Sequence, residues 1–249
     1  MTFLQGLLLG LLQGVAEFLP ISSSGHLQLV QTLFGLEDVP LLYDVFLHLA
    51  TLLAVCLYFW PKIWSLLKCF GRWIARKPAD EIETNGRKTI IAIIISTVFT
   101  GVLGIVTSKF IPDMPIKIVC AGFIVTAALL ITSAMVSKKR EQKIQNNEEP
   151  KTVSIKQSIA IGIMQGFGTL PGISRSGSTI AGALFCGVDR SLAGDYSFII
   201  SIPAILGAFI LEVKDIGEVS SSVGAVPVIA GCAAAFASGY ITLTFLMKL

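Results

Sequence analysis

The stretch from Gln13 to His26, which reads QGVAEFLPISSSGH, holds the residues best suited to chemistry. Gln13 and Glu17 are four residues apart, so a helix through them places both side chains on one face. Three serines and a glycine follow Pro20, and they offer hydroxyls and turn N–H groups of the kind that bind anions. His26 adds an imidazole, the side chain most often used for proton transfer near neutral pH. The stretch therefore predicts a polar, anion-binding site.

The surrounding sequence is that of a polytopic membrane protein. The chain has 249 residues, of which 53% are hydrophobic and 14% charged, and its mean hydropathy is +0.78. A polar cluster at membrane depth costs about 2.5 to 3.5 kcal/mol per charged residue, so it is retained where partners or function justify it. The net charge of +3 is small and lies in two loops, so it indicates membrane orientation and no nucleic-acid partner. The five cysteines form no C-x-x-C pair, which argues against a zinc site of paired cysteines and a disulfide framework.

The apolar segments predict two short hairpins and about five crossings. Phe3 to Val15 is too short to span about 30 Å of hydrocarbon, and with the break at Pro20 and the segment Leu27 to Leu36 it predicts a re-entrant helix-loop-helix. Ile159 to Phe167 and Thr179 to Val188 predict a second one. The predicted crossings are Leu41 to Trp60, Thr89 to Thr107, Pro115 to Val136, Leu192 to Leu211 and Gly224 to Met247. Basic loops are predicted from Lys62 to Lys88 and from Ser137 to Lys156.

The two hairpins are copies of one another. At a constant offset of 152 residues, eight positions of the first hairpin are identical in the second, and most are Gly, Gln or Ser. The pairs are Gly10/Gly162, Gln13/Gln165, Gly14/Gly166, Ile21/Ile173, Ser22/Ser174, Ser24/Ser176, Gly25/Gly177 and Gly35/Gly187. Three crossings separate the copies, so the second hairpin is expected to enter from the opposite face, which makes an inverted repeat. We therefore predict one all-α membrane domain, 1–249, with repeat 1 at about 1–137 (hairpin 3–36), a cytoplasmic loop at 138–157, and repeat 2 at about 158–249 (hairpin 159–188).

The copies differ at the positions where chemistry would require it. At the same offset, Thr169 stands opposite Glu17, Arg175 opposite Ser23 and Ser178 opposite His26. An arginine in a Ser-Arg-Ser-Gly turn at a helix start indicates a clamp for phosphate or carboxylate. Arg175 could alternatively serve only to neutralise Glu17.

These two stretches resemble the signature motifs of a known family. QGVAEFLPISSSGH, together with PGISRSGST from Pro171 to Thr179, is similar to the motifs of the undecaprenyl-diphosphate phosphatase family, also called the bacitracin-resistance family. The resemblance implies a membrane enzyme that removes the terminal phosphate of the C55 isoprenoid diphosphate. This reaction recycles the lipid carrier of cell-wall peptidoglycan synthesis, and it supports cell shape and bacitracin resistance.

The resemblance also implies roles for individual residues. Gln13 and Glu17 match the E/Q-x-x-x-E element linked to a divalent cation, Mg²⁺ or Ca²⁺, although many relatives have glutamate in place of Gln13. Ser23 and His26 are implied to be catalytic. Ser23 would attack the phosphorus, and His26 would activate the Ser23 hydroxyl. Arg175 is implied to hold phosphate. Attack by His26 itself or by water stays open, as does the role of Asp44 and His48. The further candidates for phosphate contacts are Ser22, Ser24, Gly25, Ser174, Ser176, Gly177 and Thr179.

Partners and location follow from the same features. The expected partners are the polyprenyl diphosphate and the lipid bilayer, and the oligomeric state, a homodimer included, stays open. Two crossings separate the basic loops, which puts both on the cytoplasmic face of the bacterial plasma membrane and opens the Ser23 hairpin to the outer face. The alternative function is a flippase for the polyprenyl phosphate, because inverted repeats with such hairpins are also found in transporters.

Overall fold

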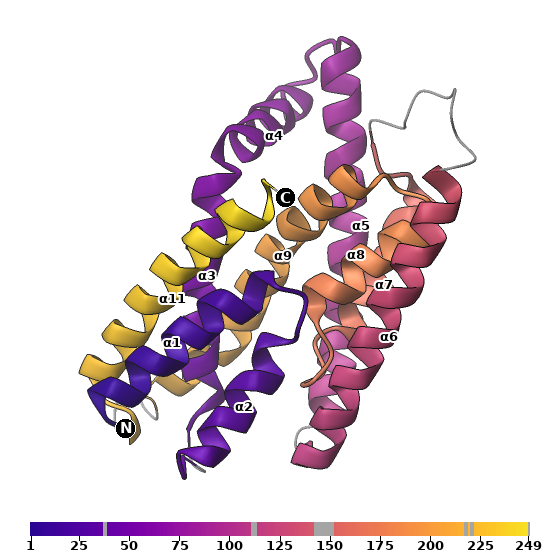
Figure 1. Ribbon diagram of the computed structural model, residues 1–249. Coiled ribbons are helices and arrows are strands. Elements are labelled where there is room, and N and C mark those ends of the chain that lie inside the picture. Colours follow the sequence, from indigo (N-terminus) through magenta and orange to yellow (C-terminus); the bar gives the residue numbers. More distant parts are fainter. Residues whose placement is uncertain (37–38, 111–113, 142–151, 217–218, 220–221, 249) are drawn as a thin grey trace.

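The computed structural model describes residues 1–249 except 37–38, 111–113, 142–151, 217–218, 220–221 and 249. Its regular elements, over the described residues, are all helices (Figure 1), which confirms the predicted all-α class. In chain order they are α1 (Phe3–Phe18), α2 (Ser23–Leu33), α3 (Leu41–Tyr58), α4 (Trp60–Ile74), α5 (Glu81–Phe110), α6 (Ile116–Glu141), α7 (Ile155–Phe167), α8 (Arg175–Phe185), α9 (Arg190–Glu212), the short 3₁₀ helix η1 (Val213–Asp215) and α11 (Ala225–Leu246).

Five of these helices are long and apolar enough to cross a membrane, which confirms the predicted number. They are α3, α5, α6, α9 and α11, and they have between 18 and 30 residues. Helix α1 is apolar but has 16 residues, and at 1.5 Å per residue it is shorter than the hydrocarbon core. The described helices are therefore of two kinds, five that are long enough to cross a membrane and others, such as α1, that are too short, and the re-entrant course of the short ones stays a prediction.

The helices of the two hairpins begin at equivalent residues. Helix α1 starts after a capping box in which Thr2 and Gln5 exchange hydrogen bonds, and α7 starts after the same arrangement of Ser154 and Gln157. Helices α2 and α8 have 11 residues each, and Ser22 and Ser174 cap them. In Figure 1, α1 and α2 extend downward from the centre whereas α7 and α8 extend upward. Entry of the two hairpins from opposite membrane faces stays a prediction.

A stripe of glycines holds α1 against α11. Gly6, Gly10 and Gly14 lie one turn apart on the face of α1 that packs on α11. A Cβ added at Gly6 would lie 2.9 Å from Pro227 Cα, and one at Gly10 would lie 2.8 Å from Gly231 Cα. Small residues at this spacing let two helix backbones approach closely within a membrane. The stripe therefore sets the position of Gln13 and Glu17 further along α1.

The substitution Gly10→Ala is expected to destabilise the protein by about 1 to 3 kcal/mol, because the added methyl group overpacks a backbone contact. The midpoint of thermal unfolding in detergent measures this. Gly101→Ala is the matched control, since Gly101 is also in a long helix but has nothing within 4 Å of an added Cβ. There the exchange should be neutral or stabilising by up to about 1 kcal/mol. Equal midpoints for both variants would contradict close packing of α1 on α11.

The predicted loop from Lys62 to Lys88 was wrong, because most of it is helical. Helix α4 occupies Trp60–Ile74, and α5 begins at Glu81, eight residues before the predicted start at Thr89. Asp80 accepts a hydrogen bond of 2.7 Å from the Glu83 N–H at this start. The charges in this region obscured the helices, since the prediction looked for uninterrupted apolar runs.

The turns of the two hairpins meet in the middle of the molecule. A Cβ added at Gly25 would lie 2.9 Å from Gly172 Cα, and one at Gly177 would lie 3.3 Å from Pro20 Cβ. The Ser176 hydroxyl donates a hydrogen bond of 3.3 Å to the backbone carbonyl of Glu17. Residues 147 to 159 positions apart in sequence are thereby brought into one site.

Candidate active site

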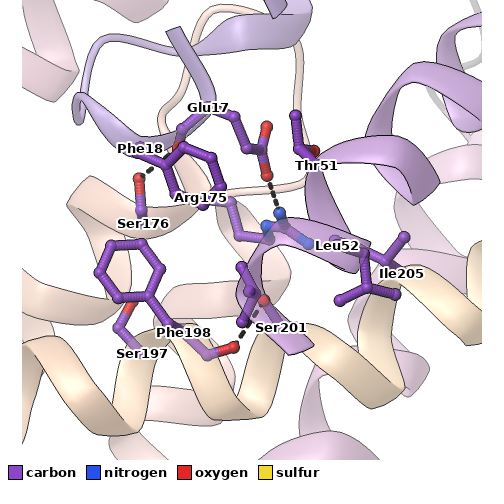
Figure 2. A pocket seen from close by; sticks show the side chains of 11 residues that line it. Glu17, Phe18, Thr51, Leu52, Arg175, Ser176, Ser197, Phe198, Ser201 and Ile205 are labelled. Carbon is purple, nitrogen blue, oxygen red and sulfur yellow. Dashed lines mark hydrogen bonds and ion pairs between the residues drawn. The ribbon is translucent and has the colours of Figure 1, made fainter. Parts of the chain in front are cut away.

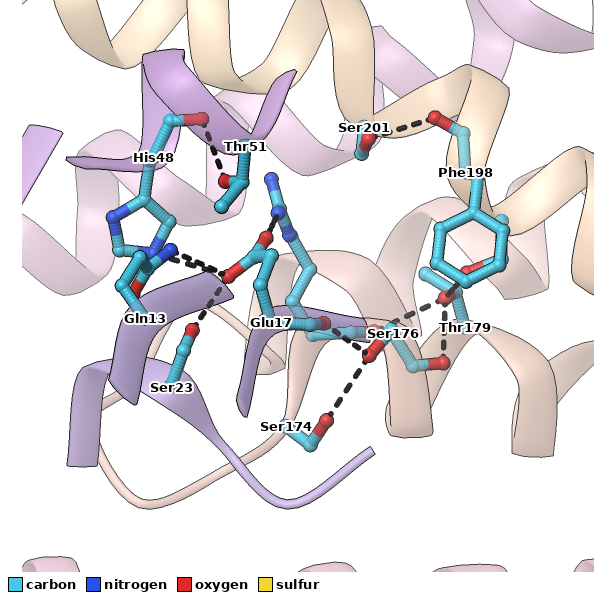
Figure 3. A network of polar contacts seen from close by, with 12 residues as sticks. Gln13, Glu17, Ser23, His48, Thr51, Ser174, Ser176, Thr179, Phe198 and Ser201 are labelled. Carbon is cyan, nitrogen blue, oxygen red and sulfur yellow. Dashed lines mark hydrogen bonds and ion pairs between the residues drawn. The ribbon is translucent and has the colours of Figure 1, made fainter. Parts of the chain in front are cut away.

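Glu17, at the end of α1, is the centre of the polar cluster (Figure 3). The Ser23 hydroxyl donates to its Oε2 at 2.5 Å, and the Gln13 Nε2 donates to the same oxygen at 3.1 Å. The Arg175 guanidinium, from the other hairpin, donates to Oε1. The Glu17 side chain is only 9% exposed, so the three donors replace the water that an ionised carboxylate loses on burial.

Gln13 lies one turn before Glu17 and is fully buried. Its Nε2 donates to Glu17, and its Oε1 has no hydrogen-bond partner among the described residues. Buried amide oxygens are rarely left unpaired, and an exception points to strain, an ion or a ligand. An amide oxygen beside a carboxylate is also the donor type that hard divalent cations prefer.

Ser23 is the first residue of α2, and the residue before it has an unusual backbone. Ser22 has φ 69° and ψ 87°, in the left-handed region that non-glycine residues seldom adopt. The Ser22 hydroxyl also accepts a hydrogen bond of 3.4 Å from the Gly25 N–H, which caps the helix. Strained residues of this kind concentrate at functional sites, where the surroundings hold them. The turn places the Ser23 hydroxyl within hydrogen-bond distance of the Glu17 carboxylate.

His26 contacts the backbone of the turn and a phenylalanine ring. Its Nδ1 lies 2.8 Å from the Ser22 carbonyl oxygen, and its ring packs on Phe123 with centroids 4.7 Å apart. Because a carbonyl only accepts, Nδ1 carries the proton and Nε2 is the nitrogen left to accept one. Among the hydrogen bonds of the described residues, none joins His26 to Ser23. The predicted activation of Ser23 by His26 stays a prediction.

Arg175 opens α8 and carries the guanidinium across to the first hairpin. Ser174 caps this helix and accepts a hydrogen bond of 3.0 Å from the Gly177 N–H, while its hydroxyl lies 3.3 Å from that of Ser176. The Thr179 hydroxyl donates a hydrogen bond of 3.0 Å to the Arg175 carbonyl, and it also forms a hydrogen bond with the Ser197 hydroxyl. The candidates for phosphate contacts in the second hairpin therefore surround Arg175, whereas Ser22, Ser24 and Gly25 start α2 on the other side of Glu17.

His48 belongs to the cluster, although the sequence alone leaves its role open. Its Nε2 lies 3.4 Å from Glu17 Oε2, and its Nδ1 lies 2.7 Å from the Asp44 carbonyl oxygen. The Asp44 carboxylate accepts a hydrogen bond of 2.7 Å from Gln31 on α2. The available signal was the spacing of Asp44 and His48, four residues apart on an apolar helix.

A small pocket of about 10 Å³, room for about one water molecule, lies beside the Glu17–Arg175 pair, between α3 and α9 (Figure 2). Its wall combines the charged pair with hydroxyl groups and with apolar side chains. The polar residues are Glu17, Thr51, Arg175, Ser176, Ser197 and Ser201, and the apolar ones are Phe18, Leu52, Val55, Phe198 and Ile205. Such a wall suits a polar headgroup attached to an apolar chain.

The arrangement supports transfer of a phosphoryl group. It offers a hydroxyl bonded to a carboxylate, a guanidinium for the phosphate oxygens and two helix N-termini that face one site. Phosphoryl transfer depends mainly on positioning and on stabilisation of negative charge, and these groups provide both.

Comparisons with known proteins point to one family. Residues 6–249 match the family described as Bacitracin resistance protein BacA. A protein of Treponema denticola named "Undecaprenyl-diphosphatase" is 45% identical over 249 residues, which cover 100% of this chain and 89% of that protein. Proteins of the same name from Desulfatibacillum aliphaticivorans and Methanosphaera stadtmanae are 40% and 36% identical, over 100% and 99% of this chain and 91% and 89% of theirs.

Proposed function

The chain belongs to the bacitracin resistance protein BacA family, and from this we propose that it hydrolyses undecaprenyl diphosphate to the monophosphate and inorganic phosphate. Relatives that share 34–45% of its residues carry the name undecaprenyl-diphosphatase. The proposal rests on one observation: the Ser23 hydroxyl donates a hydrogen bond to one carboxylate oxygen of Glu17, and Arg175 donates to the other. The reaction returns the lipid carrier to cell-wall synthesis and explains resistance to bacitracin.

Arg175 is proposed to bind the terminal phosphate. Its guanidinium is paired with Glu17, so the diphosphate must compete with a carboxylate for the same N–H groups. A phosphate carries more negative charge than a carboxylate and also accepts two parallel hydrogen bonds from arginine. Binding is therefore an exchange of anions at Arg175, and it leaves Glu17 Oε1 free.

Ser23 is proposed as the nucleophile. Its oxygen forms a bond to the terminal phosphorus while the bond from that phosphorus to the bridging oxygen breaks, and undecaprenyl monophosphate leaves. Glu17 is proposed to take the hydroxyl proton, because the hydroxyl already donates to it at 2.5 Å. His26 is the alternative acceptor. Water then hydrolyses the phosphoserine and releases phosphate.

A divalent cation, Mg²⁺ or Ca²⁺, fits the residues beside Glu17. The unpaired Gln13 Oε1 and the Glu17 carboxylate are oxygen donors of the kind these ions take. Among the described residues no group of three or more His, Cys, Asp and Glu side chains could hold a metal, so the phosphate oxygens would complete the shell. Gln13 and Glu17 would hold the ion, and its charge would stabilise the phosphate in the transition state.

The proposed location is a bacterial plasma membrane, with both basic segments on the cytoplasmic face. Helix α4 and the basic last turn of α6, Lys138 to Arg140, lie at the same end of the bundle (Figure 1), which supports this orientation. The Ser23 hairpin then opens to the outer face. Labelling of Asp80→Cys by an impermeant maleimide added outside intact cells would contradict the orientation.

Release of inorganic phosphate from C55 diphosphate by the purified protein tests the function. We expect turnover with Mg²⁺ or Ca²⁺ and its loss with a chelator, restored by adding the cation back. Lipid flipping is measured on the same proteoliposomes. Protein that flips polyprenyl phosphate but releases no phosphate with any divalent cation would overturn the proposal in favour of a transporter.

A further inference from the structure

Helix α4 has little protein around it. It follows the membrane-spanning α3 after one residue, Phe59, and it contacts α5 and the end of α3. Cys69 is the one residue of its 15 that is buried. A helix this short is marginally stable by itself in water and normally needs an apolar face packed against something.

One face of α4 is fixed to the protein by specific contacts. Lys62 pairs with Asp195 of α9 at 2.8 Å, and Arg72 pairs with Glu83 of α5 at 2.6 Å. The Cys69 thiol donates to the Glu83 carbonyl at 3.5 Å. These contacts set the rotation of α4 about its axis, so its remaining faces have a defined direction.

The outward side of α4 carries an apolar stripe. Trp60, Trp64, Leu67 and Ile74 follow one another at helical spacing, and between 48% and 68% of each is exposed. Trp60 and Trp64 stack with ring centroids 5.9 Å apart. Side chains this large and contiguous are seldom left facing water, so the stripe requires an apolar partner.

A basic stripe runs beside the apolar one. Lys68 lies over the Trp64 ring, 5.4 Å from its centroid, and Arg72 follows one turn later. Residues 60–79 contain five basic residues and no acidic one. Tryptophan beside lysine and arginine on a helix that starts at the end of a membrane span is typical of the membrane interface.

We propose that α4 lies in the membrane interface and binds the headgroups of anionic phospholipids. The apolar stripe enters the acyl region, and Lys68, whose ammonium group lies over Trp64, faces the phosphates. Continuity with α3 places the helix at the membrane boundary, and its positive charge selects lipids of negative charge. The ion pairs to Asp195 and Glu83 transmit this anchoring to α9 and α5.

Intrinsic fluorescence tests the proposal, because all three tryptophans of the chain, Trp60, Trp64 and Trp73, are on α4. The full chain with Trp73→Phe, which removes the tryptophan one helical turn after the buried Cys69, is reconstituted in phosphatidylcholine with and without phosphatidylglycerol. Lipids brominated on the acyl chains are expected to quench most of the emission. Emission that resists brominated lipid but is quenched by a water-soluble quencher would place α4 in water and overturn the proposal.

The role of the positive charge in lipid selection is tested with Lys68→Ala, which removes an exposed ammonium group without disturbing the packing of α4. Loss of one interfacial charge is expected to lower the preference for brominated phosphatidylglycerol over brominated phosphatidylcholine about fivefold. Lys117→Ala is the control, since Lys117 is an exposed lysine in the first turn of α6, and it should leave the preference unchanged. Equal quenching by the two brominated lipids in the parent protein would refute selection of anionic headgroups.

Discussion

Replacing Ser23 with alanine is expected to lower kcat for undecaprenyl diphosphate hydrolysis by about 10⁴-fold or more, because the variant lacks the hydroxyl proposed to form the covalent intermediate. Binding of the lipid should change little, since the Ser23 hydroxyl points at Glu17. Phosphate release at saturating substrate measures kcat, and acid quenching of the native enzyme should trap phosphoserine at position 23.

The adjacent Ser24→Ala is the matched control, in the same turn of α2, and it should cost about tenfold or less. Activity of Ser23→Ala within about tenfold of the native enzyme would transfer the attack to His26 or to water.

The two proposed proton acceptors, Glu17 and His26, are distinguished in the same assay. If Glu17 accepts the proton, Glu17→Gln should lower kcat by roughly 10² to 10⁴-fold, which is what removal of a general base commonly costs. If His26 accepts it, His26→Ala should show that loss instead.

Arg175→Lys is expected to lower kcat/KM by about 10³-fold although the positive charge is kept. An ammonium group is a point donor, and it cannot bind two phosphate oxygens and span the distance to Glu17 as the guanidinium does. The loss should appear mainly in kcat, because Arg175 stabilises charge on the transferring phosphoryl group. Arg76→Lys, at an exposed arginine beyond the end of α4, should have native kinetics. Native kcat/KM in Arg175→Lys would reduce Arg175 to a counter-charge for Glu17.

The elements that carry the site were largely predictable from sequence, because each depends on local signals. Apolar runs indicated the five long helices, and Pro20 with the serines after it indicated the break between α1 and α2. Glu17 and Gln13 share a helix face through spacing alone. Helix α4 was missed because Lys62, Lys68 and Arg72 interrupt its apolar residues, which is the pattern of a helix at a surface.

Most partners within the site could not be predicted, because they depend on how helices pack. Pairing of Arg175 with Glu17 was considered only as an alternative, since the offset of 152 residues set Arg175 opposite Ser23, and it is the contact that forms. His48 lies on α3 and meets Glu17 only because α1 packs against that helix. The orientation of His26 depends on the left-handed backbone of Ser22, which no sequence pattern signalled.

The equivalent boundaries of the two hairpins explain why the copies had to diverge. Their turns touch, and the contacts join non-equivalent positions, so that Arg175 of the second copy meets Glu17 of the first. Two copies of the first turn would leave the Glu17 carboxylate without a guanidinium, and two copies of the second would leave Arg175 without a carboxylate, and either unpaired buried charge is unfavourable. Duplication of this hairpin is therefore compatible with a charged centre only when one copy keeps the acid and the other supplies the base. A variant with two identical turns would lose the charge balance of the site even though its helices still formed.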